Sequence, residues 1–246
     1  MITVDFDRLN IKPGYRILDI GCGSGRHTGF AYRFKNVVVI GADISRAELM
    51  AAKARLQLHE RLGENGDGIW SLAQANIKNL PFKDNFFDLV ICSEVLEHID
   101  DDDAAAVEII RVLKPGRMLA VSVPRYLPER ICWALSPEYP RSSNGHIRIY
   151  KKNELIALLG NCGAIRWALH YAHSLHTPYW WLKCLLEPNR KDTALVKLYH
   201  RFLTWDIMKK PKWVRWMDKL FNPVLGKSLV VYLKKEKVCP VEPVGR

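Results

Sequence analysis

The sequence predicts an α/β fold in which helices cover both faces of a parallel sheet. Through the first half of the chain, short apolar runs rich in β-branched residues alternate with helix-forming stretches, an order that is typical of β-α-β units. A glycine-rich turn directly follows the first apolar run, as it does in many nucleotide-binding folds. The 246 residues are enough for one large domain with a modest addition.

The individual elements follow from local patterns. The run at 37–42 is mostly β-branched and apolar, which indicates a buried central strand. The helix at 46–62 is closed by Gly63, and the helix at 101–113 starts with acidic residues and is stopped by Pro115 and Gly116. Residues 124–145 are rich in proline and should form a loop with one short helix. The other expected strands are 17–20, 70–75, 87–92, 117–124, 164–171 and 228–234, with further helices at 26–34 and 151–159.

The net charge of +11 is unevenly distributed along the chain. Residues 1–123 contain 15 basic and 17 acidic residues, a net of −2, whereas residues 124–246 contain 22 basic and 9 acidic residues, a net of +13. Seven of the eight tryptophans also lie in the second half. A basic, tryptophan-rich half suits an anionic surface or ligand.

The six cysteines form no pattern of metal ligands or disulfides. None belongs to a C-x-x-C pair, so we expect reduced structural thiols in a cytoplasmic protein, and no metal site. We also expect no signal peptide and no transmembrane segment, because the apolar stretches are too short.

The turn Asp19-Ile20-Gly21-Cys22-Gly23-Ser24-Gly25 is the strongest local motif. Its glycines permit a sharp turn and let a ligand approach where a Cβ would collide. The dinucleotide fingerprint G-x-G-x-x-G would need its third glycine at Arg26, and no P-loop lysine follows, so both phosphate-binding patterns fit poorly.

Asp43 closes the second strand, 24 positions after Asp19. A carboxylate at this place accepts hydrogen bonds from the ribose hydroxyls of a nucleotide cofactor. The alternative interpretation is a tight turn in which Asp43 caps the next helix.

Further motifs follow this turn in order. They are Asn76-Ile77-Lys78-Asn79-Leu80-Pro81-Phe82, Phe86-Phe87-Asp88-Leu89-Val90, Leu96-Glu97-His98-Ile99 and Val112-Leu113-Lys114-Pro115-Gly116. Together with residues 17–25, the series resembles the class I S-adenosylmethionine-dependent methyltransferases, specifically the type 11 group that includes the quinone-biosynthesis methyltransferases. The resemblance covers roughly residues 9–171. It implies a Rossmann-like, seven-stranded, mostly parallel sheet with an antiparallel last strand, and S-adenosylmethionine as cofactor.

The resemblance also implies cofactor roles. Asp19 and the glycines would line the methionine and sulfonium part, Asp43 would bind the ribose, and Asn76 would edge the adenine. Asn76 stands where the family usually has aspartate, and its amide oxygen can still accept the adenine amino hydrogen. The expected cofactor-binding residues are Asp19, Gly21, Cys22, Gly23, Gly25, Asp43, Ile44, Asn76, Ile77 and Ser93.

Two histidines are candidates for catalysis. Methyl transfer from a sulfonium needs mainly alignment and exclusion of water, and it needs a base only if the acceptor holds its proton tightly. His98 follows the fourth strand, at the edge where open α/β sheets bind ligands, and His146 follows the loop after the fifth strand. Glu94 is a weaker third candidate. The alternative interpretation is that each histidine only makes local structural contacts.

The strand order of the family implies that residues 172–227 emerge above the cofactor as a helical lid. The lid would separate a core of residues 1–171 from a last strand and tail at 228–246. Two amphipathic helices are expected in it, with lysine and arginine on their polar sides. Their apolar stripes are Leu195, Leu198, Phe202, Trp205 and Met208 in the first, and Trp213, Trp216, Met217, Leu220 and Phe221 after Pro211 in the second.

Tryptophan on one side and basic residues on the other are typical of helices that lie in a membrane interface. The alternative is a pair of helices packed on the domain. Three hypotheses for the partner follow: a lipid-like or isoprenoid acceptor, with the lid on an anionic membrane at the inner face; a soluble metabolite under a closed lid; and, least favoured, a nucleic acid. No RNA-binding module is recognisable, and the aromatic residues fall at helical spacing.

Overall fold

The computed structural model describes residues 1–136, 146–186, 193–209 and 211–237. These residues form a seven-stranded sheet of order β3-β2-β1-β4-β5-β7-β6. The pairs among β1 to β5 are parallel, whereas β7 runs antiparallel to both β5 and β6. The strands are β1 Arg16–Ile20, β2 Val38–Asp43, β3 Ile69–Gln74, β4 Phe87–Ser93, β5 Leu113–Pro124, β6 Ala164–Ala172 and β7 Ser228–Lys235. The predicted fold class, with its antiparallel last strand, is confirmed.

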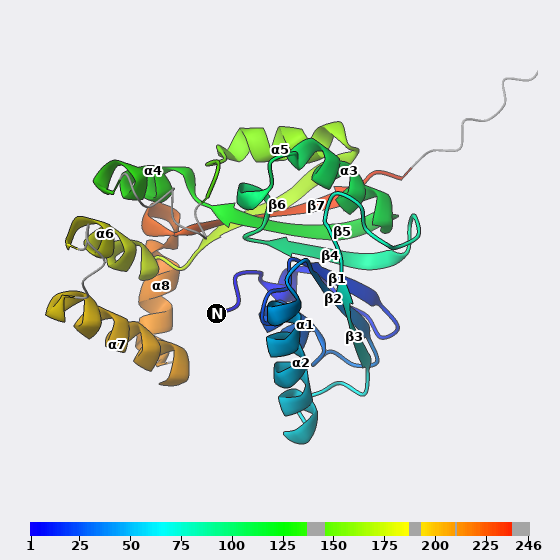
Figure 1. Ribbon diagram of the computed structural model, residues 1–246, viewed down its shortest axis with the longest axis horizontal. Coiled ribbons are helices and arrows are strands. Elements are labelled where there is room, and N and C mark those ends of the chain that lie inside the picture. The colour runs from blue at the N-terminus through cyan, green and yellow to red at the C-terminus, as the bar shows by residue number, and fades with distance from the viewer. Residues whose placement is uncertain (137–145, 187–192, 210, 238–246) are drawn as a thin grey trace, which may run out of the picture.

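Alternating side chains of the central strands fill two cores, one on each face of the sheet. Leu18 and Ile20 of β1 belong to the core under α3 (Asp102–Val112) and α5 (Lys152–Asn161). Ile17 points to the opposite core, which α1 (Arg26–Ala31), α2 (Arg46–Arg61) and the short helix η1 (Phe6–Arg8) cover. Figure 1 shows these two helical layers on either side of the sheet. Period-2 alternation along the strands therefore produces the layered architecture.

Side-chain caps fix where the helices beside the site begin. The Ser45 hydroxyl accepts the backbone N–H of Glu48 at the start of α2, and the Asp101 carboxylate accepts that of Ala104 at the start of α3. Such caps satisfy amides that have no partner within the helix.

Two predicted boundaries were wrong. The first helix ends at Ala31 and not at residue 34, and β5 begins at Leu113 and not at Arg117. The chain passes from α3 directly into β5, where Leu113 pairs with Phe87 before the register shifts at the Leu89–Met118 pair. Pro115 and Gly116 therefore follow the end of the helix as expected, but they lie in an irregular start of the strand.

Within its described residues, the predicted lid contains three helices, one more than the two expected. They are α6 (His176–Leu186), α7 (Ala194–Lys209) and α8 (Lys212–Leu225), and they lie at one end of the sheet beside α4 (Tyr126–Leu135), the short helix predicted within 124–145 (Figure 1). The Trp181 indole N–H donates to the Pro128 carbonyl at 3.0 Å, and the Thr177 hydroxyl donates to the Leu225 carbonyl at 2.6 Å. These bonds tie α6 to α4 and to α8. Within the described residues, no helix is both long and apolar enough to span a bilayer.

Candidate active site

The glycine-rich turn connects β1 to α1 at the carboxyl edge of the sheet. Gly21, Gly23 and Gly25 all have positive φ, at 63°, 49° and 74°. The Cys22 amide donates to the Ala42 carbonyl of β2 at 3.0 Å, and the Gly25 amide donates to the Cys22 carbonyl at 2.9 Å. The turn is thereby fixed to the neighbouring strand in a conformation that favours glycine.

Space as well as conformation requires glycine at the ends of the turn. A Cβ on Gly21 would lie 2.3 Å from Val95 Cγ2, and a Cβ on Gly25 would lie 2.9 Å from the Cβ of Ala52. A Cβ on Gly23 would meet only Glu48 Oε2, at 3.6 Å. Gly23 thus leaves the middle of the turn open.

Asp43 lies at the end of β2 and holds the turn from the side. One carboxylate oxygen accepts the Gly23 N–H at 2.8 Å, and the other accepts the Ser45 N–H at 2.8 Å. Asp43 therefore joins the turn to the segment before α2, whose N-cap is Ser45.

Asp19 lies beneath the turn. Its carboxylate is 1% exposed and accepts a hydrogen bond from the Thr28 hydroxyl at 2.6 Å. Burial raises the pKa of Asp19 to about 7, against the opposing effect of the Thr28 hydrogen bond. Burial also raises the pKa of the neighbouring Cys22 thiol, so this cysteine stays protonated near neutral pH.

The expected adenine and ribose residues follow β2 and β3. Ile44 is 67% exposed next to Asp43, so an apolar side chain is open at this edge. Asn76 is exposed, and its side-chain oxygen accepts the Lys78 N–H at 3.0 Å. Ile77 packs into the core, with 6% of its side chain exposed.

Ser93 closes β4 and belongs to a small polar chain. The Ser93 and Ser122 hydroxyls are 2.8 Å apart, and the Ser122 hydroxyl donates to Glu94 Oε1 at 2.9 Å. Glu94 has a φ of 57°, a conformation that side-chain-bearing residues rarely adopt. The polar chain places a carboxylate next to the expected methionine end of the cofactor site.

The two candidate catalytic histidines lie side by side. The ring centroids of His98 and His146 are 5.0 Å apart, although 48 positions separate the residues in the sequence. His146 Nδ1 lies 2.5 Å from Oε1 of Glu129, a residue of α4 that is only 2% exposed. The Ile147 N–H donates to the Glu97 carbonyl at 3.0 Å, so the segment after His146 is held against the short helix η2 (Leu96–His98).

Glu97 completes this cluster. Its side chain is fully buried, and burial together with the nearby Glu94 raises the pKa of the Glu97 carboxyl well above its usual range. Neither Glu97 nor Glu129 was among the site residues predicted from the sequence. An acid directly before His98 in a motif was a usable signal for Glu97, whereas Glu129 gave none.

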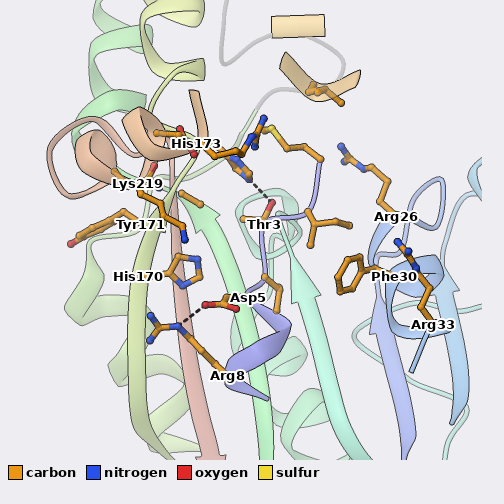
Figure 2. A pocket seen from close by; sticks show the side chains of 18 of the residues that line it. Thr3, Asp5, Arg8, Arg26, Phe30, Arg33, His170, Tyr171, His173 and Lys219 are labelled. Atoms are coloured by element: carbon orange, nitrogen blue, oxygen red, sulfur yellow. Dashed lines mark hydrogen bonds and ion pairs between the residues drawn. The ribbon is translucent and has the colours of Figure 1, made fainter. Parts of the chain in front are cut away.

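A groove of about 1190 Å³ lies between α1 and α8, with residues 1–5 between them (Figure 2). Arg26 of α1 and Arg33, which follows the end of α1, face Lys219 of α8 across it, so much of its charge is positive. None of the expected cofactor residues lines this groove. It begins beside the glycine-rich turn, because Arg26 directly follows Gly25.

The apolar stripes of α7 and α8 lie largely on the surface. We call their side chains that are 40–75% exposed the exposed helical face: Leu195, Leu198, Trp205, Met208, Trp213, Trp216, Leu220, Phe221 and Val224. The Trp205 and Trp213 rings are 6.3 Å apart, so the two stripes join. Phe202 and Met217 of the predicted stripes are half-buried. Exposed apolar surface of this extent is uncommon in proteins without a partner at that surface.

The sheet order, the antiparallel β7 and the glycine turn beside an acid on the next strand together define a class I methyltransferase fold. Residues 18–121 match the family described as "Methyltransferase domain". The resemblance found in the sequence is thereby confirmed for this segment.

Curated relatives match the same part of the chain. The chain is 32% identical to "Methyltransferase GfsG" of Streptomyces halstedii over 48% of its length and 37% identical to "Ubiquinone/menaquinone biosynthesis C-methyltransferase UbiE" of Vibrio campbellii over 45%. It is 30% identical to "Cycloartenol-C-24-methyltransferase 1" of Oryza sativa over 60%. The chain spans only about two fifths of the length of these relatives, between 39% and 41%.

Solved structures share the fold over nearly the whole chain. An S-adenosylmethionine-dependent methyltransferase from Methanosarcina mazei superposes with a TM-score of 0.60 at 16% identity, covering 96% of this chain and 99% of the other. Phosphoethanolamine N-methyltransferase 2 of Haemonchus contortus, in complex with S-adenosylmethionine, gives 0.59 at 20% identity, covering 94% of this chain and 51% of the other. The "[4+2]-Cyclase SpnF" gives 0.60 at 20% identity, covering 94% of this chain and 77% of the other. At these identities the likeness concerns the fold alone, which also supports other chemistry.

Proposed function

We propose that this chain transfers a methyl group from S-adenosylmethionine to a lipid-like or isoprenoid acceptor. The observation that carries the methyltransferase activity is the cradle of three glycines with positive φ that Asp43 holds from the side. A Cβ at either end of the turn would collide with neighbouring residues, while the middle stays open. These features fit a nucleoside-bearing cofactor that lies against the backbone.

We select the residues that would hold the cofactor by two criteria: an oxygen with a lone pair for a further hydrogen bond, or an exposed apolar side chain. Each oxygen of Asp43 accepts one backbone N–H, and each has a second lone pair for a ribose hydroxyl. Ile44 would cover one side of the nucleoside, because its side chain is exposed beside Asp43. The Asn76 amide oxygen keeps a lone pair for the adenine amino group. Ser93 and the backbone of the turn would border the methionine part.

When bound, the cofactor supplies a methyl group on a positively charged sulfur, so the leaving group needs no acid. The chain has to align the acceptor, exclude water and receive the proton of the acceptor. We assign the proton transfer to His98 and His146, the paired histidines at the carboxyl edge. The buried carboxylate of Glu129 orients the His146 ring and would stabilise its protonated form.

The exposed helical face supports a lipid-like acceptor. Lys197, Arg201, Lys209, Lys212 and Lys219 border this face, and all five are exposed. An apolar face with basic borders fits an anionic bilayer surface, such as the inner face of a cell membrane, and would bring the site to a membrane-dissolved acceptor. Two relatives have names that refer to quinone biosynthesis and to cycloartenol, which agrees with an apolar acceptor.

One observation favours a second candidate, a soluble anionic metabolite. The groove carries Arg26, Arg33 and Lys219 and could bind such an acceptor without any membrane. A nucleic acid is the least supported partner, because three of the four exposed tryptophans lie on the helices α7 and α8, and Trp167 on β6 is a single aromatic residue that forms no strand platform.

Transfer of a labelled methyl group separates these candidates. The chain is incubated with labelled S-adenosylmethionine and either a lipid extract or an aqueous extract that includes bulk RNA. Label in the organic phase supports the lipid-like acceptor. Label only in small aqueous products favours the soluble metabolite, and label in RNA contradicts both. Binding of S-adenosylmethionine without any transfer would leave only the cofactor site, and no binding at millimolar concentration would refute the methyltransferase proposal.

A further inference from the structure

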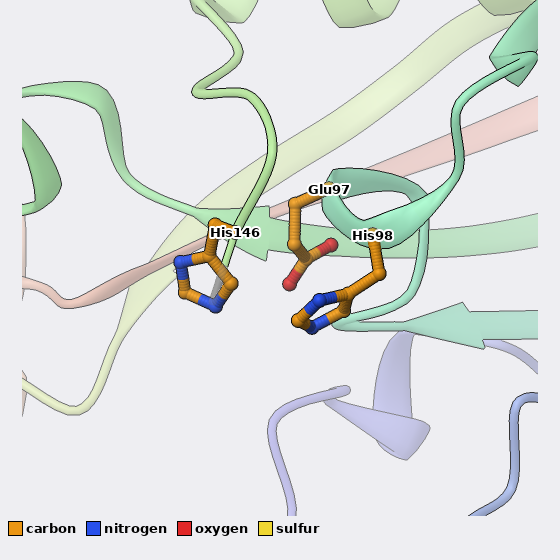
Figure 3. A group of neighbouring side chains, drawn as sticks. All are labelled: Glu97, His98 and His146. Atoms are coloured by element: carbon orange, nitrogen blue, oxygen red, sulfur yellow. The ribbon is translucent and has the colours of Figure 1, made fainter. Parts of the chain in front are cut away.

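We propose that Glu97, His98 and His146 form a binding site for a divalent transition-metal ion such as zinc. One potential ligand atom from each side chain lies within 4.8 Å of those of the other two. Figure 3 shows the Glu97 carboxylate between the two imidazole rings. Two imidazoles and one carboxylate are a common ligand set for such ions, and they leave a coordination position open for another molecule.

Glu97 is the residue that points to a missing ligand. Its side chain is fully buried, and neither carboxylate oxygen has a hydrogen-bond partner within the described part of the chain. Burial of a carboxylate without a partner is strongly unfavourable. A cation held between Glu97 and the histidines would supply the interaction that both oxygens lack.

His146 carries the second feature of a metal ligand. Its Nδ1 faces the carboxylate of Glu129 at 2.5 Å, and Glu129 is buried in α4. In metal sites, such a carboxylate accepts the proton of one ring nitrogen and leaves the other nitrogen to bind the ion. Glu129 would thus orient His146 without touching the metal.

The distances require only a small contraction. Ligands bound at about 2.1 Å by a tetrahedral ion lie roughly 3.4 Å apart. The atoms of the cluster lie within 4.8 Å of one another, so side-chain movements of about 1 Å would close the site. The backbone is already held, because the Ile147 amide donates to the Glu97 carbonyl.

A catalytic role for the ion rests on the proposed function, whereas ion binding does not. The open position would bind a hydroxyl oxygen of the acceptor, such as that of a phenol or an enol, and the ion would lower its pKa so that the proton passes to solvent. A lone pair of that oxygen, or the π electron pair at a carbon conjugated with it, then forms the new bond to the methyl carbon. The carbon–sulfur bond breaks with its electron pair remaining on sulfur. In this case His98 and His146 act through the ion and do not take the proton themselves.

The test is titration of the chelator-treated full chain with zinc chloride by calorimetry, and with cobalt chloride by absorbance. Wild type should bind about one ion tightly, and Glu97→Gln and His146→Ala should bind it at least ten-fold more weakly. The cobalt spectrum should lack a thiolate charge-transfer band, since no cysteine belongs to the site. His59→Gln is the matched control, because it removes a histidine of α2 that is paired with Glu64, outside the proposed site. It should bind the ion like wild type.

Three outcomes would overturn the site: no ion bound by wild type, equal affinity in Glu97→Gln, or a thiolate band with cobalt. Binding of S-adenosylmethionine is measured for each variant to show that the cofactor site is intact. Ion binding without methyl transfer to any acceptor would refute the proposed function and leave the metal site standing. Methyl transfer without ion binding would refute the metal site and leave the proposed function standing.

Discussion

The Val95 side chain occupies the space that a side chain at position 21 would need. Gly21→Ala adds a Cβ 2.3 Å from Val95 Cγ2, at a backbone φ of 63°. We expect this variant to lose about 1–3 kcal/mol of unfolding free energy, from strain and collision together. The measurement is urea unfolding of the variant, of Val95→Ala and of the double variant. The double variant should recover the collision part, so purely additive losses would show that Val95 does not limit this position.

Asp43 holds the glycine-rich turn and is also proposed to bind the ribose of the cofactor. Calorimetry can measure its contribution to cofactor binding. Asp43→Ala should weaken binding of S-adenosylmethionine by ~1–3 kcal/mol, because the carboxylate hydrogen bonds to the ribose are lost. Asp43→Asn keeps one acceptor oxygen and should lose less. Asp103→Ala, at an exposed position in the first turn of α3, is the control. Wild-type affinity in Asp43→Ala would remove Asp43 from the cofactor site.

The buried carboxyl of Asp19 makes stability depend on pH in an unusual direction. Because its pKa rises to about 7 in the folded chain, from 3.8 when exposed, the folded state holds this proton more tightly than the unfolded state does. The contribution of this group to stability is therefore fully present below about pH 4 and falls as pH rises towards 7. Thermal unfolding between about pH 5 and pH 8 should show wild type losing stability relative to Asp19→Asn. A constant difference between the two proteins would contradict the raised pKa.

The glycine-rich turn could be predicted because its residues are contiguous and because a sharp turn with positive φ requires its glycines. The environment of the histidines could not. Glu129 lies 17 positions before His146, on a helix that the sequence placed only roughly, and no local pattern pairs them. His98 and His146 meet because residues 146–147 lie against η2, which depends on the tertiary fold.

Most helices and strands were predictable from periodicity and from residues that end helices, but α6 was not recognised. Pro178 and the adjacent aromatic residues gave no clear helical stripe. In the structure Pro178 is the third residue of α6, within the first turn, where a missing N–H costs little. The two helices with clear stripes, α7 and α8, were predicted. Most side chains of their apolar stripes are exposed, whereas helices packed on a domain bury such stripes.

The outward face of α8 leads to a prediction at the scale of this element. Trp216 and Leu220 are 65% and 54% exposed, so Trp216→Lys and Leu220→Lys should change the unfolding free energy by no more than about 0.5 kcal/mol. Their binding to anionic vesicles should fall about ten-fold or more, because each loses the burial of a large apolar side chain in lipid. Vesicle co-sedimentation measures the effect. Leu58→Lys on α2, at 51% exposure, is the matched control and should bind like wild type. Equal binding by all variants would exclude α8 as the membrane contact.

Most of the positive charge of the molecule lies in the half of the chain that contains the proposed membrane surface. The first 123 residues are close to neutral, and the remainder, which contains α7 and α8, has a net charge of +13. A basic region that faces anionic lipid loses attraction as salt is added, because the screening length falls from about 10 Å at 0.1 M to about 3 Å at 1 M salt. Apolar insertion is much less sensitive to salt. A molecule that uses both forces should therefore lose a large part of its affinity for anionic vesicles over this range and keep a residual part.

This gives a prediction for the intact chain. Wild type should bind anionic vesicles several-fold more tightly than zwitterionic ones at 0.1 M salt, and the difference should nearly vanish at 1 M. Binding of Trp216→Lys to anionic vesicles should depend more strongly on salt than binding of wild type does, since this variant gains one positive charge and loses apolar contact. Co-sedimentation at both salt concentrations measures this, with bulk RNA as competitor. If RNA displaces the protein from vesicles at low salt and Trp216→Lys changes nothing, the basic half acts as a general anion-binding surface and the exposed helical face has another partner.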